Sequence, residues 1–137
     1  MSVTLNPYLS FKGNAREAMG FYHSVFGGEL TISTFAELHA AVDPSENDLV
    51  MHSQLTGDNG IVFMGSDTPS HMPYQAPAGI SISLSGDDEP LLSGYFTQLS
   101  DGGTVMQPLE KAPWGDMFGM FTDRFGITWL VNVSAAA

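Results

Sequence analysis

Apolar and polar residues alternate near the start of the chain, and this alternation then gives way to helical spacing. Leu9 and Phe11 alternate with Tyr8 and Ser10, the period-two pattern of a half-buried strand. The apolar residues that follow recur every three or four positions, as on one face of a helix: Ala15, Ala18, Met19, Tyr22, Val25 and Phe26. The two periods predict a strand followed by an amphipathic helix.

The ends of this helix also carry recognisable signals. Asn14 stands where a capping side chain is expected, and Glu17 three residues later completes a pattern like a capping box. Gly27 and Gly28 predict the end of the helix, because glycine readily adopts a positive φ. The helix is therefore expected between residues 14 and 27.

Three strands and a linker are expected to follow. The strands span roughly residues 30–37, 50–55 and 61–65, and the sequence Gly-Asp-Asn-Gly at 57–60 signals a hairpin between the last two. The run DTPSHMPYQAPAG contains three prolines and is typical of a connecting segment. The first half thus predicts the order β-α-β-β-β.

The second half repeats the first. LSFKGNAREAMGFYHSVFGGELTIS has a fainter copy in ISLSGDDEPLLSGYFTQLSDGGTVMQ, at an offset of about 73 residues that puts Tyr22 on Tyr95. GDNGIVFM likewise matches DRFGITWL and puts Phe63 on Trp129. In the second copy, Asp87 or Asp88 is expected to cap the helix. We expect one α+β domain over residues 1–137, with modules at about 1–66 and 79–137 and a linker at about 67–78.

The composition of the chain excludes several classes of partner and of chemistry. The chain has 15 acidic residues against 4 Lys and Arg, a net charge of -11, so it lacks the basic patch that nucleic acid or an anionic membrane would require. It has no cysteine, which excludes disulfides, thiolate metal sites and thiol nucleophiles. We expect a cytoplasmic protein, because no signal segment and no apolar run of about 18 residues is seen.

Four segments carry a family resemblance. PYLSFKGNAREAMGFYHSVFGGEL, MHSQL, PWGDMFGMFTDRFG and WLVNV resemble the PhnB-like branch of the vicinal oxygen chelate superfamily, which includes glyoxalase I, bleomycin-resistance proteins and extradiol dioxygenases. The resemblance spans nearly the whole chain. It implies two modules whose curved sheets enclose a cleft, paired in a homodimer. PhnB-like proteins often carry a methyltransferase name, but no glycine-rich strand-to-helix turn for a nucleotide-type cofactor is visible, and no cofactor is expected.

The resemblance also locates the metal ligands of the superfamily's enzymes. A metal-binding Glu of those enzymes lies four residues after the glycine of the final hairpin, and here that position holds Met64 and Leu130. The opening strands offer no His or Glu at the matching positions, which are Pro7 and Ile80 in one register and Asn6 and Gly79 in the other. Apolar side chains cannot bind a hard divalent ion, so we expect no metal.

Strand parity predicts which side chains line the cleft. If Met51, Ser53 and Leu55 face one way, Val50, His52 and Gln54 face the other. The expected ligand pocket comprises Tyr8, Ser10, His52, Met64, Ser81, Ser83, Trp114, Leu130 and Asn132. Such an apolar wall with a few hydroxyl and amide groups is typical of a small-molecule pocket. The alternative is that small polar residues simply fill a closed interior.

The predicted function is metal-independent binding of a small, partly apolar molecule, such as an aromatic compound. The catalytic alternative is a metal-dependent lyase, isomerase or dioxygenase that uses His52 with loop carboxylates such as Glu37, Glu110 or Asp116. A third reading is a dimeric scaffold that binds no ligand. The sequence identifies no catalytic residue.

Overall fold

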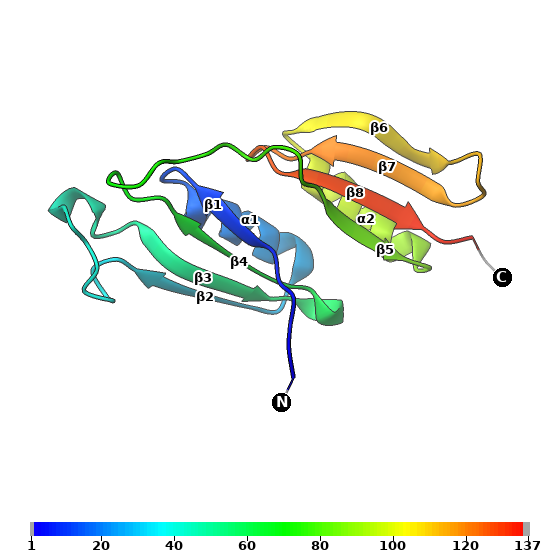
Figure 1. Ribbon diagram of the computed structural model, residues 1–137. Helices are drawn as coiled ribbons and strands as arrows, with labels where there is room; N and C mark the ends of the chain where they lie inside the picture. The colour runs from blue at the N-terminus through cyan, green and yellow to red at the C-terminus, as the bar shows by residue number, and fades with distance from the viewer. Residues whose placement is uncertain (1, 136–137) are drawn as a thin grey trace. The chain divides into compact units, whose positions relative to one another are not determined.

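The computed structural model describes residues 2–135 of the chain. The chain divides into two compact units, Met1–Ala76 and Pro77–Ala137, and each unit contains a four-stranded sheet and one long helix (Figure 1). The predicted α+β fold of two β-α-β-β-β modules is confirmed. Within residues 2–135, no helix is long and apolar enough to cross a membrane.

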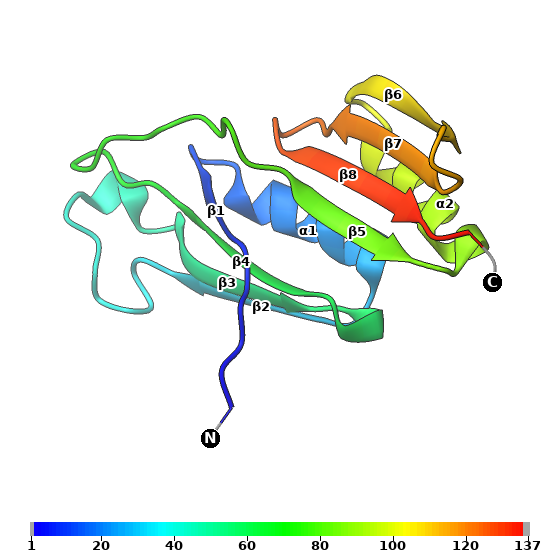
Figure 2. The same ribbon diagram turned by 45° about the vertical axis from the view of Figure 1, so that its right-hand side comes forward.

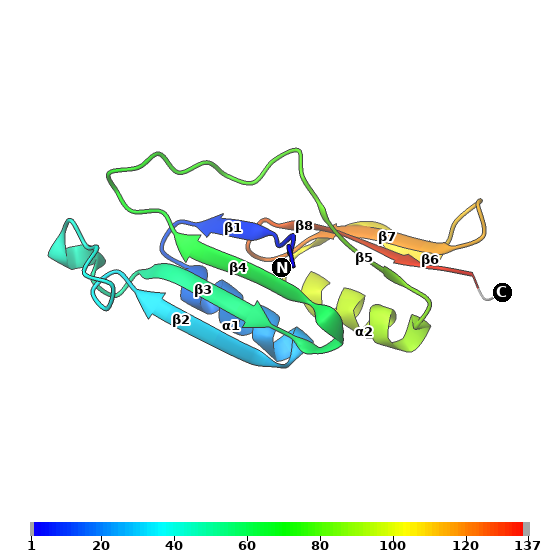
Figure 3. The same cartoon turned by 60° about the horizontal axis from the view of Figure 1, so that its bottom comes forward.

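The first unit has its helix on one face of the sheet (Figure 3). Its elements are β1 (Tyr8–Phe11), α1 (Ala15–Phe26), β2 (Glu29–Thr34), the 3-10 turn η1 (Pro44–Glu46), β3 (Val50–Thr56), the 3-10 turn η2 (Asp58–Gly60) and β4 (Val62–Asp67). The strand order is β1-β4-β3-β2, in which β1 and β4 run parallel and the other neighbours antiparallel.

The second unit repeats this topology (Figure 2). Its elements are β5 (Ile82–Gly86), α2 (Glu89–Ser100), β6 (Thr104–Lys111), β7 (Met117–Thr122) and β8 (Thr128–Val133). The order is β5-β8-β7-β6, with β5 and β8 parallel. Both units therefore place their first and last strands side by side.

The core of each unit lies between the helix and the sheet. In the first unit the Phe63 ring packs edge-on against Tyr22 and Phe26, with centroids 5.3 and 6.0 Å apart. In the second, the rings of Phe96 and Phe121 lie 5.0 Å apart. The predicted helix face is buried in α1 except for Val25, which is half-buried. Edge-to-face pairs of this kind add to the free energy gained by burial itself.

The start of α1 differs from the prediction. Asn14 occupies the N-cap position but its side chain makes no capping hydrogen bond. Instead Asp67, the last residue of β4, accepts a hydrogen bond at Oδ1 from the Ala15 N–H (2.9 Å) and one at Oδ2 from the Val50 N–H (2.9 Å). Because β4 runs parallel to β1, its end reaches the start of the helix that follows β1. The N-terminus of α1 is thus capped by a residue 52 positions away.

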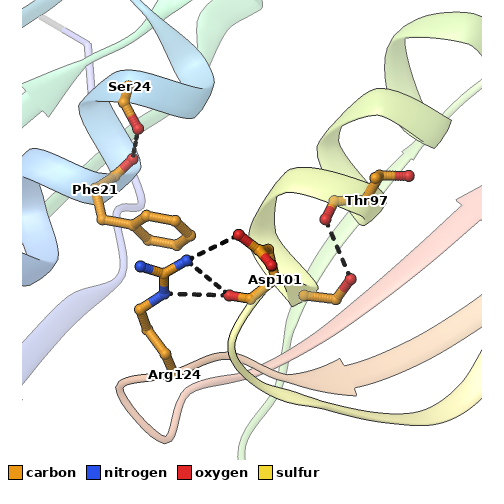
Figure 4. Close-up of polar contacts among 6 residues, drawn as sticks. Phe21, Ser24, Thr97, Asp101 and Arg124 are labelled. Atoms are coloured by element: carbon orange, nitrogen blue, oxygen red, sulfur yellow. Dashed lines mark hydrogen bonds and ion pairs between the residues drawn. The ribbon is translucent and has the colours of Figure 1, made fainter.

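The start of α2 follows the sequence prediction. Asp88 occupies the N-cap position, and its Oδ1 accepts a hydrogen bond from the Leu91 N–H (3.1 Å). At the other end of α2, Arg124 donates from Nε and Nη2 to the Asp101 carbonyl (3.1 and 2.9 Å) and from Nη2 to its carboxylate (3.3 Å) (Figure 4). These bonds attach the β7–β8 turn to the end of the helix.

The paired glycines of the repeat have a steric explanation. Gly28 has φ +80°, and a Cβ there would overlap the Thr56 carbonyl oxygen. A Cβ at Gly103 would overlap the Thr122 carbonyl oxygen in the same way. In both units the second glycine lets the chain leaving the helix pass close to the end of a neighbouring strand.

β2 is shorter than expected because a local turn replaces its last residues. The strand ends at Thr34 rather than at residue 37. The Thr34 N–H donates to the Glu37 carboxylate, and the Glu37 N–H donates to the Thr34 hydroxyl, each at 3.1 Å. Such side-chain bonds to the backbone compete with strand pairing.

Candidate functional site

The first unit presents an open sheet face opposite α1. Tyr8 pairs with Met64 on β4, and Met64 pairs with Gln54 on β3, so the three side chains share this face. The His52 ring lies 6.0 Å from the Tyr8 ring, centroid to centroid. Tyr8 is 49% exposed and Met64 is half-buried. With Ser10, all four predicted pocket residues of this unit lie on one face.

One parity assignment in β3 was wrong. Val50 is buried and Met51 is 37% exposed, the reverse of the expected facing. The pairing of β2 with β3 shifts between Ser33 and Thr34, whose partners are His52 and Val50, so that Met51 has no partner in the ladder. This bulge resets the alternation and turns Met51 to the side opposite the core.

The second unit has a matching open face. Leu130 on β8 pairs with Ser83 on β5 and with Met120 on β7. Asn132 pairs with Phe118 on β7. Ser81, also predicted to line a pocket, is exposed and lies just before β5. Phe118 and Met120 were missed by the sequence prediction, although their alternation with the buried residues of β7 could have identified them.

The strand register refines the repeat. Tyr8 lies beside Met64, and Ser83 lies beside Leu130. Met64 and Leu130 are equivalent in the repeat, so their strand partners, Tyr8 and Ser83, are equivalent too. The sequence offset of about 73 residues would instead match Tyr8 with Ser81. In the helices the offset of about 73 residues holds. The buried residues Met19, Tyr22 and Phe26 of α1 correspond to the buried residues Leu92, Tyr95 and Leu99 of α2.

The donor groups on the open faces do not fit a hard divalent ion. Met64 and Leu130 supply a thioether and a hydrocarbon, and Tyr8 and Ser83 supply neutral hydroxyls. The Pro7 carbonyl accepts a hydrogen bond from the Met64 N–H (3.0 Å). Within residues 2–135, no three His, Asp or Glu side chains come together as a metal site.

The carboxylates of the catalytic alternative are each bonded locally, and Glu110 lies in β6 rather than in a loop. The Glu110 carboxylate accepts from the Gln107 side chain (3.2 Å), and Glu37 belongs to the turn after β2. Asp116 accepts from the Ala135 N–H (2.9 Å) and the Asn132 amide (3.1 Å). These two hydrogen bonds, chiefly the one from the Ala135 N–H, hold the pKa of Asp116 below its ordinary value. The Asn132 amide, predicted to contact ligand, is therefore engaged with Asp116.

Three of the four histidines lie outside the strands that form the open face with His52. His23 lies in α1, and its Nε2 is 2.9 Å from the Gly28 carbonyl oxygen. His39 sits in a turn with φ 54°, and His71 lies in the loop after β4. His52 thus lies on the open face itself, whereas His71 lines a cavity together with Ser10.

Trp114 stands on the loop between β6 and β7. The residue is 63% exposed, and its ring lies 5.8 Å from the Phe118 ring, centroid to centroid, at an interplanar angle of 64°. The two rings, with Gln107 and Lys111, line a cavity of about 350 Å³. Exposure of so large a ring is uncommon and makes it available for stacking on a flat molecule.

Comparison with known proteins identifies relatives along nearly the whole chain. Residues 3–132 match the family model described as 3-demethylubiquinone-9 3-methyltransferase. The structure of protein PA1353 from Pseudomonas aeruginosa is similar to this chain, with 38% identity, a TM-score of 0.84, and coverage of 98% of this chain and 100% of that chain.

Two further solved structures are similar to this chain. A putative 3-demethylubiquinone-9 3-methyltransferase, PhnB protein, from Bacillus cereus is 27% identical, with a TM-score of 0.77 over 96% of this chain and 100% of that one. A member of the glyoxalase/bleomycin resistance protein/dioxygenase superfamily from Sphaerobacter thermophilus is 20% identical, with a TM-score of 0.57 over 98% of this chain and 100% of that one. The second likeness concerns the fold alone.

Proposed function

We propose that this chain, which belongs to the PhnB-like family described as 3-demethylubiquinone-9 3-methyltransferase and has the fold of the glyoxalase/bleomycin resistance/dioxygenase superfamily, binds a small, partly apolar molecule without a metal ion. An aromatic compound is the form of ligand that we favour. The observation that carries the proposal is the composition of the two open sheet faces. Met64 and Leu130 occupy their centres, where metal-dependent relatives would need a carboxylate.

The neighbours of these two residues support binding of a ring compound. Tyr8 and His52 add flat rings beside Met64, and Phe118 adds one on the face of Leu130. A thioether makes favourable contacts with aromatic rings and adapts to irregular shapes. The hydroxyl of Ser83 supplies a polar group that could orient a ligand. A homodimer and a cytoplasmic location complete the proposal.

The test begins with protein purified without chelator. We expect metal analysis to find no stoichiometric zinc, nickel, manganese or iron, and a library of aromatic metabolites to contain compounds that raise the melting temperature. A stoichiometric metal that disappears in His52→Ala would contradict the proposal in favour of the metal-dependent enzyme. A shift with S-adenosylmethionine alone would instead favour the chemistry in the family's name.

Paired variants locate the binding. Met64→Glu introduces a charge at the centre of the first open face, whereas Met106→Glu makes the same change on β6, where the side chain is 48% exposed. We expect Met64→Glu to lose the ligand-induced melting shift and Met106→Glu to keep it, because a buried charge beside an apolar ligand is costly. Equal shifts in both variants would count against an open-face site. Light scattering measures whether the protein is a dimer.

A further inference from the structure

We propose that the first unit holds a second binding site, a loop-bounded cavity for a planar ring compound that carries a neutral or cationic hydrogen-bond donor. The cavity measures about 430 Å³, within the range of small-molecule sites. Of the predicted pocket residues, it is lined by Ser10 alone. The cavity lies wholly in the first unit and borders its open face, because Ser10 pairs with Ser66 on that face. Its ligand is proposed separately from the open-face ligand.

Two loops and three strands form the cavity. Ser10, Met51 and Ser66 come from β1, β3 and β4, while Phe35 and Met72 come from the loops after β2 and β4. Met51 reaches the cavity because of the bulge in β3. The inference therefore depends on a feature that the sequence pattern did not reveal.

A buried glutamate holds the two loops together. Glu46 of η1 is 8% exposed, and its Oε2 accepts a hydrogen bond from the Ser70 N–H (2.7 Å) in the loop after β4. The same loop begins with a bond from the Thr68 N–H to the Phe11 carbonyl (2.8 Å). The walls are thus fixed before a ligand arrives, which lowers the entropic cost of binding.

The apolar lining favours a ring. Met51 and Met72 are 37% and 55% exposed, and Val42 at the same cavity is 72% exposed. Large apolar side chains gathered in this way are typical of interaction sites. Phe35, 6% exposed, supplies an aromatic wall, and the two thioethers can contact the edges and faces of an aromatic ligand.

The polar lining favours a donor without negative charge. Ser10 and Ser66 contribute hydroxyls, and Asp67, which is 3% exposed, also lines the cavity. Both Asp67 oxygens accept buried backbone N–H groups, so its charge acts on a ligand at a distance, and a ligand donor would bond to the hydroxyls. Thr68 adds a third hydroxyl to the lining and His71 an imidazole. A ligand anion would be repelled by Asp67 and by a chain of net charge -11.

Methionine-methyl NMR with three matched probes tests the site. The probes are 2-naphthylmethanol, 2-naphthylmethylamine and 2-naphthoic acid, which share a ring system and differ in charge. We expect the alcohol and the amine to shift the Met51 and Met72 methyl signals, and the acid to bind about tenfold more weakly. Met64 and Met120 report on the open faces, and Met19, on the fully buried face of α1, serves as the reference.

A pair of variants supplies the control. Ala40→Phe fills the cavity, whereas Ala41→Phe makes the same change one residue away, outside the lining. We expect the first to lose the Met51 and Met72 shifts and the second to keep them. Met72→Ala, on an exposed loop, is expected to weaken binding of both probes without unfolding the protein, and so keeps the test valid if Ala40→Phe does not fold.

Three outcomes would overturn this site. If only the Met64 or Met120 methyl signals shift, the second site is refuted and the open-face proposal remains intact. Absence of shifts at Met51 and Met72 with all three probes would also refute the second site. The third is movement of these two signals when the protein alone is diluted, because a second copy of the chain would then cover the cavity.

Discussion

Replacing Asp67 with alanine removes the acceptor of two buried backbone N–H groups, those of Ala15 and Val50. All three residues are at most 3% exposed, so water cannot replace the lost bonds without opening the unit. Each unsatisfied donor costs about 1–3 kcal/mol, and the loss of a helix cap is included in that range, so we expect Asp67→Ala to lower the free energy of unfolding by about 3–5 kcal/mol. Asp67→Asn keeps one acceptor oxygen and should lose about half as much.

Urea unfolding followed by circular dichroism measures this loss, and tryptophan fluorescence shows where it acts. Both tryptophans lie in the second unit, so a first unit that unfolds alone would lose helical signal before fluorescence changes. Asp48→Ala is the control, because Asp48 is exposed and accepts a hydrogen bond from Arg16 at its backbone carbonyl, which the substitution keeps. A loss below about 1 kcal/mol in Asp67→Ala would refute the long-range cap.

Three further predictions concern single side chains. Asp123→Ala should lower unfolding free energy by about 3 kcal/mol and change the fluorescence of Trp129, whose indole N–H donates to Asp123 (2.9 Å); an unchanged midpoint would contradict this. Gly28→Ala should cost more than about 2 kcal/mol in urea unfolding, because positive φ and a backbone overlap combine, and a neutral effect would disprove the steric argument. The bonds from the Ala135 N–H and the Asn132 amide lower the pKa of Asp116, so the stability they contribute is complete above the ordinary carboxyl pKa near 4 and is lost as pH falls through the lower pKa of the folded state. An NMR titration of the Ala135 amide should therefore have its midpoint below the ordinary carboxyl pKa. A midpoint above that value would contradict the hydrogen bond between Asp116 and Ala135.

Local signals predicted most of the secondary structure. The end of α1 at Gly27 and the N-cap of α2 at Asp88 were predictable, because both depend on residues only a few positions away. The cap of α1 was not, because the acceptor lies 52 residues away and becomes a neighbour only through the parallel pairing of β1 with β4. Asp67 also looked like the start of a proline-rich linker, although it is the last residue of β4.

The candidate site was predictable only as far as strand alternation holds. Tyr8 and Met64 share a face because β1 and β4 are regular where they pair. Met51 was assigned to the wrong face because a bulge depends on the partner strand, which one strand's sequence does not reveal. The cavity of the first unit was missed for a similar reason, since its loops meet through Glu46 and Ser70.

The contrast between the two helix caps has a consequence for the order of folding. α2 carries its own acceptor in Asp88, so its first turn can be stabilised as soon as the helix nucleates. The first turn of α1 must wait for β4 to pair with β1, which requires closing a loop of more than fifty residues. During synthesis, α1 therefore emerges without its cap and gains it only after Asp67 has left the ribosome, whereas α2 can form as it emerges.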